Sequence, residues 1–139
     1  MEATLVLSDT AARVAGIVLL TIVTIELGGT YLLRVVAGDV ERTPFQVAFA
    51  RAGHAHAGML VTLGLVCLLL AEASGLTGVV GWLGRTGVLV AAILMSAGFF
   101  FASMHRGATR PNRWIALVWV GAAFLAAGVV SLGLGLLTV

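Results

Sequence analysis

Several polar residues lie inside or beside apolar stretches of this sequence, and Glu26 is the first that could do chemistry. It stands in the apolar run 14–33, about eight residues before Arg34, or roughly 12 Å along a helix that rises 1.5 Å per residue. A charged side chain at the centre of a membrane span costs about 2.5–3.5 kcal/mol. Because Glu26, Thr30 and Arg34 recur at intervals of four, they share one helix face. We expect Glu26 to lie inside the protein, hydrogen-bonded to a polar group of a later span, for a structural or a functional purpose.

Two histidines follow in the stretch Arg51-Ala-Gly-His-Ala-His-Ala-Gly58. On an α-helix, residues two apart lie about 200° apart around the axis, so His54 and His56 face different directions. Both could reach one ion only if the helix unwinds, which Gly53 and Gly58 would permit. We expect His54 to face the bundle and the polar stripe of the first span, because Arg51 and Gly58 share its face. We expect His56 to face headgroups, a neighbouring protomer or another helix pair.

The third histidine, His105, stands with Arg106 at the end of a later apolar run. All three histidines therefore converge on one side of the predicted helices. Glu26, His105 and one of His54 and His56 could bind Zn²⁺, Cu²⁺ or Fe²⁺, or two of the rings could hold a b-type haem. A lipophilic ligand is an alternative, and so is a proton relay in which Glu26 carries the proton and a histidine passes it to the cytoplasm. No nucleophile or oxyanion device is apparent, so the sequence names no catalytic residue.

The composition indicates what must position these residues. Of 139 residues, 60% are hydrophobic and 10% are charged, and the mean hydropathy is +1.13. A soluble domain is about a quarter charged, so the composition excludes that class and favours a lipid bilayer. Helices are the expected form, because their backbone groups are paired internally. We predict one all-α domain over residues 1–139, an integral membrane four-helix bundle whose spans cover 14–33, 52–71, 86–104 and 114–137.

Short connections, at 39–50, 72–85 and 105–113, predict antiparallel up-down neighbours. Six arginines flank the first and third connections, whereas two lie on the other side. Because arginines near span ends stay in the cytoplasm, this bias predicts that both termini lie outside the inner (plasma) membrane. The formal charge is only +2 and the arginines form no basic stripe, so nucleic acid is not an expected partner. The six are Arg34, Arg42, Arg51, Arg106, Arg110 and Arg113, and the two are Arg13 and Arg85.

The second span carries a helix-start signal well before its apolar run. In Thr43-Pro44-Phe45-Gln46, Thr43 suits the N-cap, Pro44 the first helical position and Gln46 the third. A helix that begins near residue 44 would run for about 30 residues, or ~45 Å, against a hydrocarbon core of ~30 Å. We therefore expect this helix to tilt or to project into the cytoplasm.

Small residues mark the faces where helices approach closely. Gly121, Gly128 and Gly135 recur every seven residues on the fourth span, and Gly53 and Gly58 stand on the second. In lipid, such residues allow the close packing that holds helices together. We expect this packing within the chain, with a homo-oligomer or a larger membrane complex as the alternative.

The stretch RAGHAHAG, residues 51–58, resembles one in uncharacterised small four-helix bacterial membrane proteins of similar length. The four-span topology is also similar to that of the MAPEG class of membrane enzymes, and Arg51-Ala52 with a nearby histidine carries that likeness. This second resemblance implies an enzyme acting on a lipophilic substrate at the cytoplasmic face. The residues themselves predict a His/Glu/Arg site near the cytoplasmic leaflet that binds a metal, haem or lipophilic ligand, or relays protons. A non-catalytic accessory subunit of a larger membrane complex is the alternative.

Overall fold

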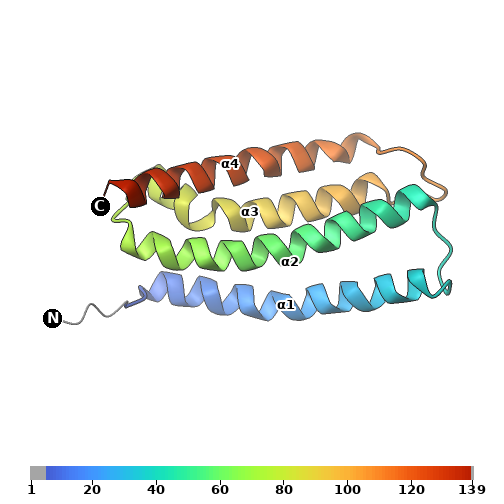
Figure 1. Cartoon of the computed structure of the whole chain (residues 1–139), viewed down its shortest axis with the longest axis horizontal. Coiled ribbons are helices and arrows are strands. Elements are labelled where there is room, and N and C mark those ends of the chain that lie inside the picture. Colours follow the sequence, from blue (N-terminus) through green and yellow to red (C-terminus); the bar gives the residue numbers. More distant parts are fainter. Residues whose placement is uncertain (1–5, 139) are drawn as a thin grey trace.

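The computed structural model describes residues 6–138, and four long helices account for most of them (Figure 1). All four are long and apolar enough to cross a membrane, and no strand occurs among the described residues, so the all-α prediction is confirmed for them. Residues 1–5 and 139 of the predicted domain lie outside the described part. The helices are α1 (Asp9–Val36), α2 (Pro44–Ala73), α3 (Gly78–Ala102) and α4 (Ala116–Leu137), with a short 3₁₀ turn at Arg113–Ile115 before α4.

Successive helices run in opposite directions in Figure 1, so α1 begins at the end of the molecule where α4 finishes. The α1–α2 and α3–α4 connections lie together at the opposite end. We name this the arginine end, because its two connections hold Arg42, Arg106 and Arg110. The short α2–α3 connection lies at the other end.

The start of α2 is defined by reciprocal hydrogen bonds. The backbone N–H of Gln46 donates to the Thr43 hydroxyl oxygen, and the Thr43 backbone N–H donates to the Gln46 side-chain oxygen, both at 3.1 Å. Pro44 occupies the first turn, where a missing N–H costs nothing. The sequence predicts a start near residue 44, and α2 begins at Pro44 and runs for 30 residues.

The start of α3 differs from the expected span of 86–104. The helix begins at Gly78 and ends at Ala102, so Trp82 and Arg85 lie inside it and not in a connection. Arg85 looks like a span boundary in the sequence because it is charged. In the fold its Nε lies 3.2 Å from Glu72 Oε1 on α2, and this ion pair allows the charge to sit within the helix.

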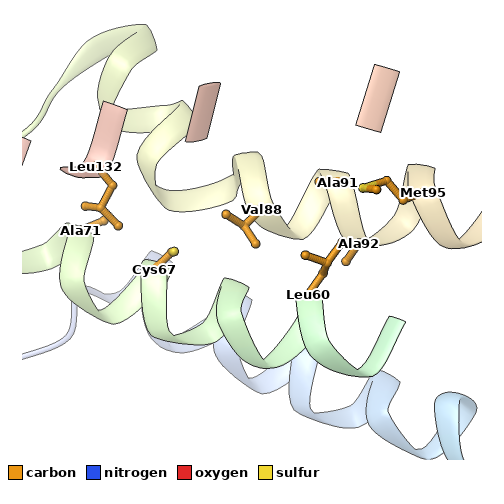
Figure 2. Close-up of a cluster of buried hydrophobic side chains, with 8 residues drawn as sticks. All are labelled: Leu60, Cys67, Ala71, Val88, Ala91, Ala92, Met95 and Leu132. Carbon is orange, nitrogen blue, oxygen red and sulfur yellow. The ribbon is translucent and has the colours of Figure 1, made fainter. Parts of the chain in front are cut away.

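The buried apolar cluster lies between α2, α3 and α4, and none of its residues comes from α1 (Figure 2). Among the described helices, the backbone of α1 approaches that of α2 only, so α1 stands at the edge of the bundle. Many large apolar side chains point outward, as a protein solvated by lipid requires. The cluster comprises Leu60, Cys67, Ala71, Val88, Ala91, Ala92, Met95 and Leu132.

Glycines of α4 are buried against α3 and the α2–α3 connection. A Cβ at Gly128 would lie 3.0 Å from the Leu83 carbonyl oxygen and 3.2 Å from Gly87 Cα. Gly121 is equally close to Met95, and Gly135 to Leu76. The seven-residue glycine repeat therefore permits close contact within the chain, as small residues do between membrane helices.

The two α2 glycines behave differently from each other. A Cβ at Gly53 would lie 3.1–3.2 Å from the rings of Phe100 and the Cβ of Phe99 on α3, so Gly53 is a packing residue. At Gly58, no atom of the described residues lies within 4 Å of such a Cβ, so α2 could carry a larger side chain there. Helix packing at Gly58 therefore stays a prediction.

Candidate functional site

At the arginine end, the first turn of α2 holds the α3–α4 connection. The buried Gln46 side chain donates from Nε2 to the backbone oxygens of Ser103 and His105, both at 3.0 Å. The Thr43 hydroxyl donates to the Ala108 carbonyl oxygen. The residues that begin the helix thus also fix the loop that closes the bundle.

A second fixed point in the same connection is Asn112. Its backbone N–H donates to the Ala102 oxygen at 3.0 Å, and its Nδ2 donates to the Phe101 oxygen at 2.9 Å. Its Oδ1 accepts the N–H of Trp114 at 2.9 Å and caps the turn that leads into α4. The loop therefore presents its exposed side chains, Arg106 among them, from a defined backbone.

Arg42 ties the α1–α2 connection back to α1. Its Nε donates to the Tyr31 hydroxyl oxygen at 2.9 Å, and its guanidinium carbon lies 6.0 Å from the centre of the Tyr31 ring. Its Nη1 donates to the Glu41 backbone oxygen at 3.3 Å. The guanidinium carries five N–H donors, so others remain for a ligand.

Two hollows meet at Arg42 and Gln46. The inner one, about 300 Å³, lies between α1, α2 and α3 and is mostly apolar. The outer one, about 760 Å³, lies between the two connections and is the more polar of the two, with two arginines and two carboxylates on its walls. The inner hollow is lined by Gly28, Tyr31, Val35, Arg42, Gln46, Val47, Phe100, Phe101, Ser103 and Met104, and the outer by Asp39, Val40, Glu41, Arg42, Thr43, Gln46, Arg106 and Gly107.

The histidines of α2 contact different helices. The His54 ring lies against α1, where a Cβ at Gly29 would be 3.3 Å from its Cε1 and a Cβ at Gly28 would be 3.5 Å from its Nδ1. The His56 ring centre lies 4.9 Å from that of Phe99 on α3, and its Nδ1 is 2.8 Å from the Ala52 oxygen. This divergence is what regular helix geometry requires of residues two apart.

The third histidine, His105, is exposed in the α3–α4 connection beside Phe101, Met104 and Trp114. Within residues 6–138, no group of three or more His, Cys, Asp or Glu side chains is arranged to hold a metal ion. The structure therefore does not bring the three histidines and Glu26 together as one set of ligands.

Glu26 is exposed on α1, so the expectation that it lies inside the bundle is wrong for the single chain. Thr30 and Arg34 are exposed on the same face, and the Thr30 hydroxyl donates to its own helix at the Leu27 oxygen. The physical reason is the edge position of α1. Because this helix has one neighbour, only one of its faces is covered, and the polar stripe is on another. Arg51, on α2, is exposed as well.

A polar cluster at the opposite end did not figure among the expected site residues. Glu72 accepts the Ser8 backbone N–H at Oε2 (2.9 Å) and pairs with Arg85 at Oε1, while Arg85 also donates to the Leu76 oxygen at 3.3 Å. These bonds join the start of α1, the end of α2 and the start of α3. The opposite charges of Glu72 and Arg85, on either side of a short connection, were the available signal.

Comparison of the chain with protein-family models, curated proteins and solved structures gives no significant match. No matching family therefore supports the resemblance of residues 51–58 or that of the four-span topology.

Proposed function

We propose that this chain is a multi-pass membrane protein that binds an amphipathic, lipid-soluble ligand at its arginine end. The observation that carries the proposal is the meeting, at Arg42 and Gln46, of a mostly apolar hollow and a hollow whose walls carry four charged side chains. An amphipathic molecule would place its apolar part between α1 and α3 and its head between the two connections. Volumes of about 300–1,000 Å³ are usual for small-molecule sites, and both hollows lie in this range.

The charges of the outer hollow favour a zwitterionic head. Arg42 and Arg106 supply two positive charges, and Asp39 and Glu41 supply two negative charges. A phosphate group would accept charge-assisted hydrogen bonds from the guanidinium groups, and a primary amine would donate to the carboxylates. Phosphoethanolamine has both groups. Tyr31 supports this role by holding the Arg42 side chain in place before a ligand arrives.

The first test compares lipid binding by Arg42→Gln and Arg110→Gln variants. We expect detergent-purified wild-type protein to retain phosphatidylethanolamine over phosphatidylglycerol in native mass spectrometry. Arg42→Gln should weaken the retention at least about tenfold, because hydrogen bonds to charged groups contribute about 1.5–3 kcal/mol. Arg110 lies at the same end and lines neither hollow, so Arg110→Gln should bind as the wild type does. Equal binding by both variants, or equal retention of both lipids, would contradict the proposal.

The proposal also places the arginine end in the cytoplasm, with both termini outside the inner membrane. The six-to-two arginine bias supports this orientation. In a Cys67→Ala background, we expect Asp39→Cys and Thr109→Cys to resist an impermeant maleimide added from the non-cytoplasmic side. Thr77→Cys, exposed in the α2–α3 connection, is the positive control and should react. Labelling at residues 39 and 109, with none at 77, would reverse the orientation.

A second candidate function, an accessory subunit of a larger membrane complex, is favoured by the exposed Glu26. A carboxyl group on the outer face of a span is costly in hydrocarbon, and a basic or hydroxyl-bearing helix of a partner would relieve that cost. A subunit of this kind would show no saturable lipid binding in the first test. Metal or haem binding by His54, His56 or His105, the proton relay and the MAPEG-like activity stay predictions, because the described side chains give them no specific support.

A further inference from the structure

A third hollow lies between α1 and α3, over the face of α2, and shares no lining residue with the two at the arginine end. Its volume is about 380 Å³. It exists because α1 packs on α2 alone, which leaves α1 and α3 apart along their middle turns. Most of its walls are apolar, no charged side chain lines it, and its polar groups are the hydroxyls of Thr21, Thr24 and Ser96.

The three hydroxyl groups differ in whether their protons already have a hydrogen-bond acceptor. Thr21 donates to the Val18 oxygen and Thr24 to the Thr21 oxygen, both at 2.6 Å, so their protons are already used within α1. Ser96 on α3 is only 9% exposed, and its Oγ has no hydrogen-bond partner among the described residues. A buried hydroxyl without a partner is costly in an apolar setting, where no water replaces the missing bond.

We infer that this groove binds a neutral, lipid-soluble molecule whose carbonyl oxygen accepts a hydrogen bond from Ser96. The Ser96 hydroxyl has no acceptor among the described residues, so a ligand that accepts a hydrogen bond would satisfy it. No charged side chain lines the groove, so this ligand should be uncharged. Because the groove lies along apolar, membrane-length helices, such a molecule would enter sideways from the bilayer. The ligand class is therefore a hydrophobic ketone, quinone or ester. This site goes beyond the head-group site of the proposed function and does not depend on it.

The test uses benzophenone with an alkyl chain, a hydrophobic ketone that inserts into nearby C–H bonds when irradiated. In detergent-purified wild-type protein, we expect mass spectrometry to find adducts concentrated on residues 17–25 of α1 and 89–96 of α3. At a limiting probe concentration, Ser96→Ala should reduce these adducts about two- to tenfold, the effect of one net hydrogen bond. Ser131→Ala, which makes the same change on α4, should leave them unchanged.

Two further variants make the result decisive. Ala57→Phe places a ring in the groove from the α2 side and should remove the adducts at both segments, provided that circular dichroism shows a folded protein. Arg42→Gln should leave the adducts unchanged, so a failure here is distinct from a failure of the head-group site. Equal labelling of wild type and Ser96→Ala would overturn the inference. So would adducts spread evenly over the exposed apolar residues of the four helices.

Discussion

Gly128→Val is expected to destabilise the protein by about 3 kcal/mol, because a branched side chain at this position meets backbone and not a movable side chain. A Cβ there lies 3.0 Å from the Leu83 carbonyl oxygen and 3.2 Å from the Val88 nitrogen on α3. Added atoms in a packed core cost about 1–3 kcal/mol, and the upper value applies where neither backbone can yield. The measurement is thermal or denaturant unfolding in detergent, followed by circular dichroism.

Gly133→Val is the matched control on the same helix. A Cβ at Gly133 has no atom within 4 Å, so the change in stability should be within about 0.5 kcal/mol. Both variants replace a helical glycine by valine, so helix propensity is the same for both. If the two lost stability equally, close packing of α3 and α4 would not be the cause.

Gln46→Leu should lower the free energy of unfolding by about 3 kcal/mol. The substitution keeps a side chain of similar size in the buried position but removes every hydrogen bond that Gln46 makes through its amide. It leaves the Ser103 and His105 oxygens and the Thr43 N–H without their partner. The bond to Ser103 is buried and the other two are partly buried, and a buried unpaired group costs about 1–3 kcal/mol. Unfolding in detergent, followed by tryptophan fluorescence, measures the loss.

Gln46→Glu separates the acceptor role of this side chain at the helix start from its donor role toward the α3–α4 connection. A glutamate can still accept the Thr43 N–H at the helix start, but it cannot donate to the two carbonyl oxygens of the α3–α4 connection. We expect it to lose at least as much stability as the donor bonds provide, with the start of α2 intact by hydrogen exchange. A Gln46→Leu protein as stable as the wild type would show that the α2 start does not hold the connection.

Local sequence signals allowed the start of α2 to be predicted. The cap at Thr43, the proline at 44 and the glutamine at 46 act over one turn, so their effect does not depend on distant residues. The start of α3 was less readable, because Arg85 resembles a span boundary until its partner Glu72 is known. The length and apolar character of the four runs follow from the sequence alone, and runs of this kind favour helices, which is why the all-α class was predictable.

The candidate site was readable only in part. The opposite directions of His54 and His56 follow from helix geometry, but the helix that each ring contacts depends on tertiary packing. Glu26 was misplaced because the sequence does not say that α1 has a single neighbour. Arg42 is far from Tyr31 in sequence, and its hydrogen bond arises only when the α1–α2 connection folds back.

Because α1 lies at the edge, the order in which the helices are synthesised differs from the order in which the buried cluster forms. α1 is synthesised before the other three helices, yet none of the residues in the buried cluster belongs to it. Seven of its eight residues lie on α2 and α3 and the eighth, Leu132, lies on α4, so the cluster is complete only after α4 has packed on the other two helices. Until α4 is in place, the α3 glycines that it covers, Gly87 and Gly98, remain open to the surroundings.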